Sequence, residues 1–107
     1  MISVLLSAAP TADVAKTIAR ALVEERLVAC VNIIAGVTSV YRWQGAVHED
    51  AEVMLVMKTA PERVAAVAAR LRELHPYEVP ELIALPSDTA LPAYAQWVLA
   101  ETAPIAV

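Results

Sequence analysis

The stretch that decides the fold is Ser39–Thr59, SVYRWQGAVHEDAEVMLVMKT. In its first part, side chains of different character alternate in steps of two, with Ser39, Tyr41 and Trp43 on one face, which is the periodicity of a strand. Gln44-Gly45 is a turn signal, and the sequence then passes from polar residues into an apolar run. We therefore predict a long, protruding hairpin made of strands Thr38–Gln44 and Ala46–Lys58.

Upstream of the hairpin, the pattern predicts a strand, a helix and another strand. The apolar run Ile2–Ser7 is typical of a buried strand, and Thr11 is a suitable N-cap for the helix that follows. The apolar stripe of that helix is made of Val14, Ile18, Ala21 and Leu22. Leu27–Ile34 is apolar and β-branched, so it predicts a second strand, which Gly36 breaks or bends.

Downstream of the hairpin, Thr59-Ala60-Pro61-Glu62 is a strong helix start. Thr59 is placed to cap the helix, Pro61 fits its first turn, and Glu62 completes a capping box. The expected buried stripe is Val64, Val67, Ala68, Leu71 and Leu74. The helix must end near Leu74, because Pro76 disfavours a helical conformation at the residue before it.

The remaining apolar segments predict one more strand and one more helix. Val79–Pro86 has strand character, but Pro80 has no N–H, so we expect an edge strand or one that enters the sheet only after Pro80. Leu91–Thr102 predicts a short C-terminal helix. The order is that of an α+β, ferredoxin-like split βαβ fold (βαββαβ) with an extended hairpin and a C-terminal helix. Residues 1–107 should form a single domain.

The predicted sheet has two apolar faces. Right-handed crossovers place both main helices on one face. The opposite face also carries apolar side chains, and in an isolated chain it would be a large exposed apolar patch. We therefore expect other subunits to cover it.

Composition and charge exclude several classes of protein. Apolar residues make up 59% of the chain and the formal net charge is −4, with no cluster of Lys and Arg, which argues against a nucleic-acid or anionic-membrane partner. No apolar run approaches the roughly 20 residues of a membrane span. The N-terminus is typical of a strand rather than a signal peptide, and Cys30 is the only cysteine, so we expect a cytoplasmic protein.

The sequence carries no recognisable catalytic motif. With only Gly36 and Gly45 it has no glycine-rich phosphate loop, and it has no zinc motif. Cys30 has no activating base near it in the sequence. We therefore expect a protein that is not an enzyme.

Several stretches together resemble one family. They are LVEERLVACVNI (22–33), the hairpin stretch quoted above, LHPYEVPELIALP (74–86) and the late Trp97. In this order and spacing they look like the CutA family of divalent-cation tolerance proteins. The resemblance implies a ferredoxin-like protomer in a tight homotrimer with the long hairpin pairing across subunits, a link to tolerance of copper and other divalent metals, and a fold relationship to the trimeric PII signalling proteins.

The resemblance also bears on metal binding. In bacterial members the proposed copper site uses a cysteine at the end of the first strand and histidine just before Pro-Tyr. Here Ser7 takes the cysteine position and Leu74 takes the place of one of the paired histidines seen in some members, so His75 and then Cys30 are the candidate ligands for copper or another divalent cation. The alternatives are a histidine that complements a helix C-terminus and a cysteine that is a small buried hydrophobe on a central strand.

A second set of polar and aromatic residues lies in the hairpin and in the stretch LHPYEVPELIALP. If the hairpin meets that stretch of a neighbouring subunit, an interfacial binding cleft results, and otherwise these residues form a subunit interface. The set is Tyr41, Arg42, Trp43, Lys58, Tyr77, Glu78 and Glu81. A further cluster, His48, Glu49, Asp50 and Glu52, either attracts hard cations or forms a solvated hairpin end.

Three functions follow as hypotheses. The first is a non-enzymatic homotrimer associated with divalent metal (copper) tolerance that binds metal ions through His75 and Cys30. The second is a PII-like trimer that senses small molecules in clefts between subunits. The third is a trimerisation scaffold for another partner.

Overall fold

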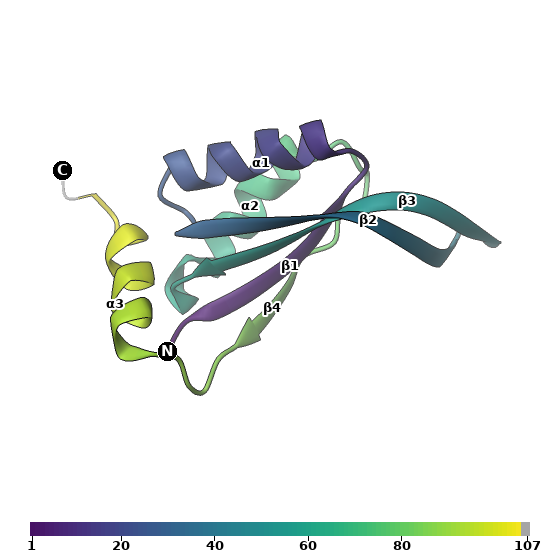
Figure 1. Ribbon diagram of the computed structural model, residues 1–107. Coiled ribbons are helices and arrows are strands. Elements are labelled where there is room, and N and C mark those ends of the chain that lie inside the picture. The colour runs from purple at the N-terminus through teal and green to yellow at the C-terminus, as the bar shows by residue number, and fades with distance from the viewer. Residues whose placement is uncertain (106–107) are drawn as a thin grey trace.

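The computed structural model describes residues 1–105. The elements are β1 (Ser3–Ala9), α1 (Ala12–Glu24), β2 (Cys30–Trp43), β3 (Ala46–Thr59), a 3₁₀ turn (Pro61–Arg63), α2 (Val64–Leu74), β4 (Ile83–Pro86) and α3 (Pro92–Glu101) (Figure 1). The strands form one antiparallel sheet in the order β2-β3-β1-β4. Each helical crossover therefore joins two parallel strands with a third strand between them, which confirms the predicted ferredoxin-like fold.

Both main helices pack on the same face of the sheet, as predicted (Figure 1). The core between them joins buried side chains from three sources. The sheet contributes Leu5, Val53, Leu55 and Met57, α1 contributes Ala15, Ile18 and Leu22, and α2 contributes Val67 and Leu71. The stripe of α1 is rotated slightly from the predicted one, since Ala15 and Ala19 are buried while Val14 and Ala21 are only half-buried.

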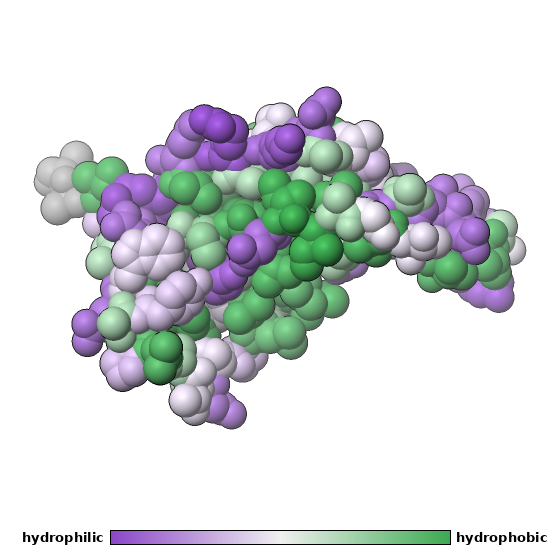
Figure 2. Space-filling model, in the orientation of Figure 1, coloured by the Kyte–Doolittle hydropathy of each residue, from purple (hydrophilic) through white to green (hydrophobic). Residues whose placement is uncertain are grey.

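The other face of the sheet, which we call the open face, carries the alternate side chains of the same strands. Strand register places Val4, Lys58, Cys30 and Leu85 in one row, and Leu6, Val56, Asn32 and Ile83 in the next. Ile34 and Met54 extend these rows toward the hairpin. In Figure 2 this face is a hydrophobic area below α1, whose own outer surface is hydrophilic.

The hairpin extends well beyond the helices (Figure 1). β2 is a single strand that runs through Gly36, where the register with β3 shifts between Ile34 and Val37. Gly36 has a φ of +79°, so it bends the strand as a bulge and does not end it. At the tip, Gln44 and Gly45 both have positive φ, which is the geometry of a type I′ turn and matches the right-handed twist of the flanking strands.

Two local predictions need correction, and a third is confirmed. Thr59 does not cap a helix, because its hydroxyl donates a hydrogen bond to the Leu27 carbonyl oxygen at 2.7 Å. β2 begins at Cys30 rather than Leu27 and is an edge strand of the sheet, not a central one. The confirmed prediction is that of β4, which begins at Ile83, after Pro80, and lies at the opposite edge of the sheet, as expected from the missing N–H of that proline.

Candidate functional site

A cleft of about 670 Å³ lies where the base of the hairpin meets the segment that follows α2. That segment turns at the proline-restricted corner after Leu74 and crosses the end of β1. The lining residues include Ser39, Tyr41, Trp43 and Glu52 from the hairpin and Tyr77, Glu78 and Glu81 from the segment. The two stretches whose meeting was expected between subunits therefore already meet within one chain.

Tyr77 holds the two sides of the cleft together. Its hydroxyl donates a hydrogen bond to Glu52 Oε2 at 2.8 Å, and its backbone N–H donates to His75 Nδ1 at 3.1 Å. Its ring also contacts the His75 ring, with a centroid separation of 4.7 Å. Burial, and then the hydrogen bond to Glu52, raise the pKa of Tyr77, so the phenol remains protonated at neutral pH.

Tyr41 forms the hairpin wall of the cleft and is also fixed from two directions. Its hydroxyl donates a hydrogen bond to Asp50, and its ring stacks on His48 with centroids 5.4 Å apart. The hydrogen bond to Asp50 is the main cause of a raised pKa of Tyr41. The side chain is nevertheless 41% exposed, so the ring face remains accessible from the cleft.

The segment after α2 is fixed to β1 by a hydrogen bond from a side chain of β1 to the backbone of the segment. Ser7 is fully buried, and its hydroxyl donates a hydrogen bond to the Glu81 carbonyl oxygen at 2.7 Å. This contact leaves the Glu81 carboxylate to line the cleft together with Glu78. The position that the resemblance assigns to a metal-binding cysteine therefore holds a hydroxyl that fixes the backbone of the cleft.

His75 is buried, and both of its ring nitrogens have partners. Nδ1 accepts the Tyr77 backbone N–H, so Nε2 carries the proton and donates it to the Ala8 carbonyl oxygen at 2.7 Å. The ring is therefore neutral and joins the end of α2 to the end of β1. A metal ion that binds at either nitrogen must displace one of these two contacts.

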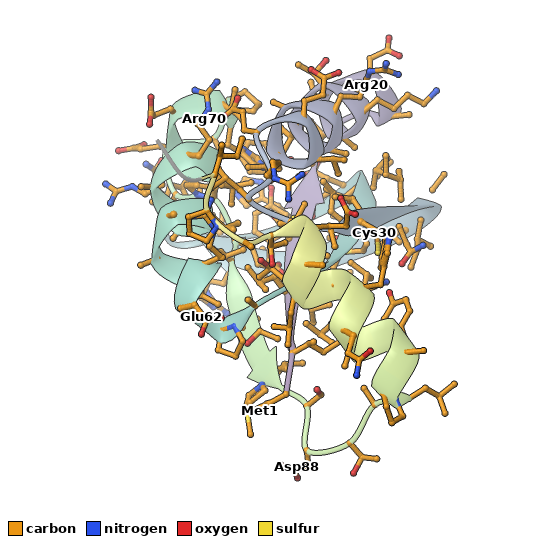
Figure 3. All side chains as sticks on the ribbon, turned by 90° about the vertical axis from the view of Figure 1, so that its left-hand side faces the viewer. Met1, Arg20, Cys30, Glu62, Arg70 and Asp88 are labelled. Carbon is orange, nitrogen blue, oxygen red and sulfur yellow. The ribbon has the colours of Figure 1, made fainter. Side chains whose placement is uncertain are left out.

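Cys30 lies at the other end of the sheet from His75. Cys30 lies in the same row of the sheet as Val4, whereas His75 contacts Ala8. Val4 and Ala8 are four positions apart on β1, which corresponds to about 13 Å along the strand. Cys30 Sγ lies 3.5 Å from the Tyr94 hydroxyl, and Figure 3 shows it beside α3. This hydrogen bond, and then burial, raise the pKa of Tyr94 to about 12.

The other predicted residues divide between the cleft and the rest of the surface. Tyr41, Trp43, Tyr77, Glu78 and Glu81 line the cleft. Arg42 pairs with Val47 on the opposite side of the hairpin, and Lys58 lies on the open face, where its ammonium group donates to Asn32 Oδ1. Within residues 1–105, no group of at least three His, Cys, Asp or Glu side chains is arranged to hold a metal ion.

The sequence analysis did not assign Glu52 to the cleft, although the Glu52 side chain lines the cleft and is held in place by the Tyr77 hydroxyl. The signal was its place on β3, two positions before Met54 and four before Val56, which puts these side chains on one side of the strand. The Glu52 side chain therefore lies on the same side of β3 as Met54 and Val56.

Comparison with known proteins identifies the family. The family described as CutA1 divalent ion tolerance protein matches residues 3–101. The chain belongs to this family. A "Divalent-cation tolerance protein CutA" from Thermus thermophilus is 49% identical over 102 residues, covering 95% of this chain and 99% of that protein. The human "Protein CutA" is 51% identical over 89 residues, and the chain spans about half the length of this and the mouse relative.

Solved structures of CutA proteins have the same fold as this chain. The structure of the divalent cation tolerance protein from Thermus thermophilus superposes with a TM-score of 0.93 over 95% of this chain and 99% of that chain. CutA from Xylella fastidiosa, 40% identical, gives 0.92 over 94% and 97% of the two chains. The family is named for tolerance of divalent ions rather than for a reaction. In residues 1–105, no helix is both long and apolar enough to cross a membrane.

Proposed function

We propose that this CutA-family chain acts in divalent-cation tolerance as a homotrimer and that it does so without catalysing a reaction. Membership of the family supports the tolerance role. The observation that carries the assembly is the open face. Ile34, Ile83 and Leu85 are 49%, 48% and 48% exposed there, and Val4, Leu6, Met54 and Val56 fill the area between them. Side chains of this size gain free energy when they leave water, so copies of the chain cover the face.

The oligomeric state is tested by multi-angle light scattering at micromolar concentration. The chain has a mass of 11.4 kDa, and the proposal requires a particle three times as heavy. A stable, soluble particle with the mass of one chain contradicts it. We also propose a cytoplasmic location, in keeping with the single cysteine, which has no partner for an internal disulfide.

Metal contact, as part of this proposal, takes place at His75. The geometry makes binding weak, because an ion must replace either the Ala8 carbonyl or the Tyr77 N–H at the ring. Calorimetric titration of copper(II), zinc and magnesium should give saturable binding that His75→Ala removes. His48→Ala, which changes the other histidine, is the matched control. Equal binding by wild type and His75→Ala contradicts a role for His75.

A second candidate function is the sensing of a small molecule, and the cleft favours it. Its volume of about 670 Å³ lies in the range of small-molecule sites, and aromatic and polar side chains line it together. A ligand that binds only the folded protein raises its melting temperature. A thermal-shift screen with cationic, anionic and neutral compounds tests this function, and no shift with any class opposes it.

A further inference from the structure

The cleft carries negative charge only. Glu52, Glu78 and Glu81 line it, and no Lys or Arg is among the described residues of its lining. The basic residues that sequence reasoning placed with them lie elsewhere, since Arg42 is on the far side of the hairpin and Lys58 is on the open face. An anionic ligand would therefore meet like charge on every polar wall. The field in the cleft selects for a cation.

The aromatic walls favour the same charge. The negative faces of Tyr and Trp rings attract a cation within about 6 Å of the ring centre. Tyr41, Trp43 and Tyr77 supply rings from both sides of the cleft, and in the single chain each is roughly two-fifths exposed, so ring surface is available there. Asp50 and His48 fix Tyr41, and Glu52 and His75 fix Tyr77. Little side-chain entropy is left to lose when a ligand binds.

We propose that the cleft binds an organic ammonium ion, with its charged head between the aromatic rings and the carboxylates. A bare divalent metal ion fits this site less well. It requires several oxygen, nitrogen or sulfur ligands around one point, and no such group occurs in residues 1–105. The Glu52 carboxylate already accepts the Tyr77 hydroxyl, which fixes its position and leaves its charge unneutralised. An alkylated ammonium is weakly hydrated and bulky, so it gains most from rings and loses least on leaving water.

This inference rests on the proposed small-molecule role and names the class of its ligand. Choline is the first probe, and 3,3-dimethylbutan-1-ol, which has the same shape without the charge, is its neutral counterpart. Calorimetry on the full-length, assembled protein should show saturable binding of choline and at least about tenfold weaker binding of the alcohol. Binding of choline should also weaken as salt is raised, since the carboxylates are partly exposed.

Variants locate the site. Glu52→Gln removes a charge and retains an acceptor for Tyr77, and Trp43→Leu removes a ring. Each should weaken choline binding by roughly three- to thirtyfold, the range of a single cation–π or ionic contact. Glu24→Gln is the matched control, because it makes the same charge change on the outer surface of α1, where that side chain is 70% exposed. Light scattering on each variant separates loss of the site from loss of assembly.

Each outcome decides between named possibilities. Equal binding of choline and the neutral alcohol means that the cleft takes a small molecule but does not select a cation, so the inference fails while the sensing role stands. Binding of anions in preference to choline has the same meaning. No binding of any class overturns the sensing role as well. If Glu24→Gln weakens choline binding as much as Glu52→Gln, the ion responds to the net charge of the protein and the cleft is not its site.

Discussion

A single aspartate on the open face tests whether copies of the chain cover it. Val56 lies in the middle row of this face, between Asn32 and Leu6, and is half-buried in the isolated chain. Complete burial of a side chain of this kind contributes about 1.5–3 kcal/mol, so the half-exposed Ile34, Ile83 and Leu85 alone have about 2–4 kcal/mol per chain left to gain on assembly. An unpaired carboxylate buried at Val56 costs about 3–5 kcal/mol and offsets that gain.

Val56→Asp should therefore convert the assembled protein into single chains at micromolar concentration. Light scattering measures the mass directly, and circular dichroism shows whether the released chains remain folded. Val23→Asp is the control, because Val23 lies on α1, away from the open face, and is 40% exposed. If Val56→Asp retains the mass of the wild-type assembly, the open face is not the interface and the reasoning from its apolar surface is refuted.

Three further predictions concern stability. The contact with Cys30 raises the pKa of Tyr94 from 10.0 to about 12, so the stabilising contribution of this contact is complete below pH 10.0 and is lost as the pH rises through about 12. Tyr94→Phe should therefore reduce the loss of stability at alkaline pH, measured by urea unfolding. An unchanged pH profile of stability in the variant contradicts this prediction. The Arg70 guanidinium, which bonds both carboxylate oxygens of Glu25, lowers the pKa of Glu25 below its ordinary 4.5. The contribution of this pair is complete above pH 4.5 and is lost as the pH falls through the lower folded-state pKa of Glu25. Arg70→Gln should therefore reduce the loss of stability as the pH falls below 4.5, and a steeper loss in the variant opposes the assignment. Gly45→Ala should cost about 1–2 kcal/mol through its φ of +80° alone, because an added Cβ has no neighbour within 4 Å; equal unfolding midpoints of variant and wild type would count against a strained turn.

The periodic segments of the fold could be predicted from the sequence because their signals are local. Thr11 caps α1 as expected, since the acceptor and the Val14 N–H lie within one turn of each other. The proline rule placed the end of α2 at Leu74 and the start of β4 after Pro80 for the same reason. These features need no knowledge of what packs on them.

The errors arose where a distant partner competes with the local one. Thr59 has the sequence context of a cap, but the carbonyl of Leu27, 32 residues away, takes its hydroxyl. Gly36 was expected to break or bend its strand, and it bends the strand, because the partner β3 continues the ladder past it and the extra residue becomes a bulge. The residues around Thr59 do not indicate that Leu27 is its partner.

The candidate site was predicted in part for a related reason. Tyr41, Trp43 and Tyr77 were expected in a cleft between subunits, and in the structure they line a cleft within one chain, because a hairpin face and a rigid corner fix the direction of their side chains. Lys58 was placed with these three residues but lies on the open face. Strand alternation predicts the side of β3 on which the Lys58 side chain lies, but only the fold determines its distance from Tyr77. Cys30 was assigned to a central strand, and the sheet order puts it on an edge.

The position of Lys58 has a consequence for any assembly that uses the open face. Its ammonium group donates to the side-chain oxygen of Asn32 in the middle of apolar rows, and this neutral partner satisfies a hydrogen bond without compensating the charge. An interface that buries Lys58 must therefore bring a carboxylate to it or leave it at a wet margin. A purely apolar face would accept many orientations of a second copy. A charge at one point of the face excludes the orientations in which that charge has no partner. In an assembly through the open face, Lys58 therefore sets the register of the contact, and Val56 and its neighbours supply its strength.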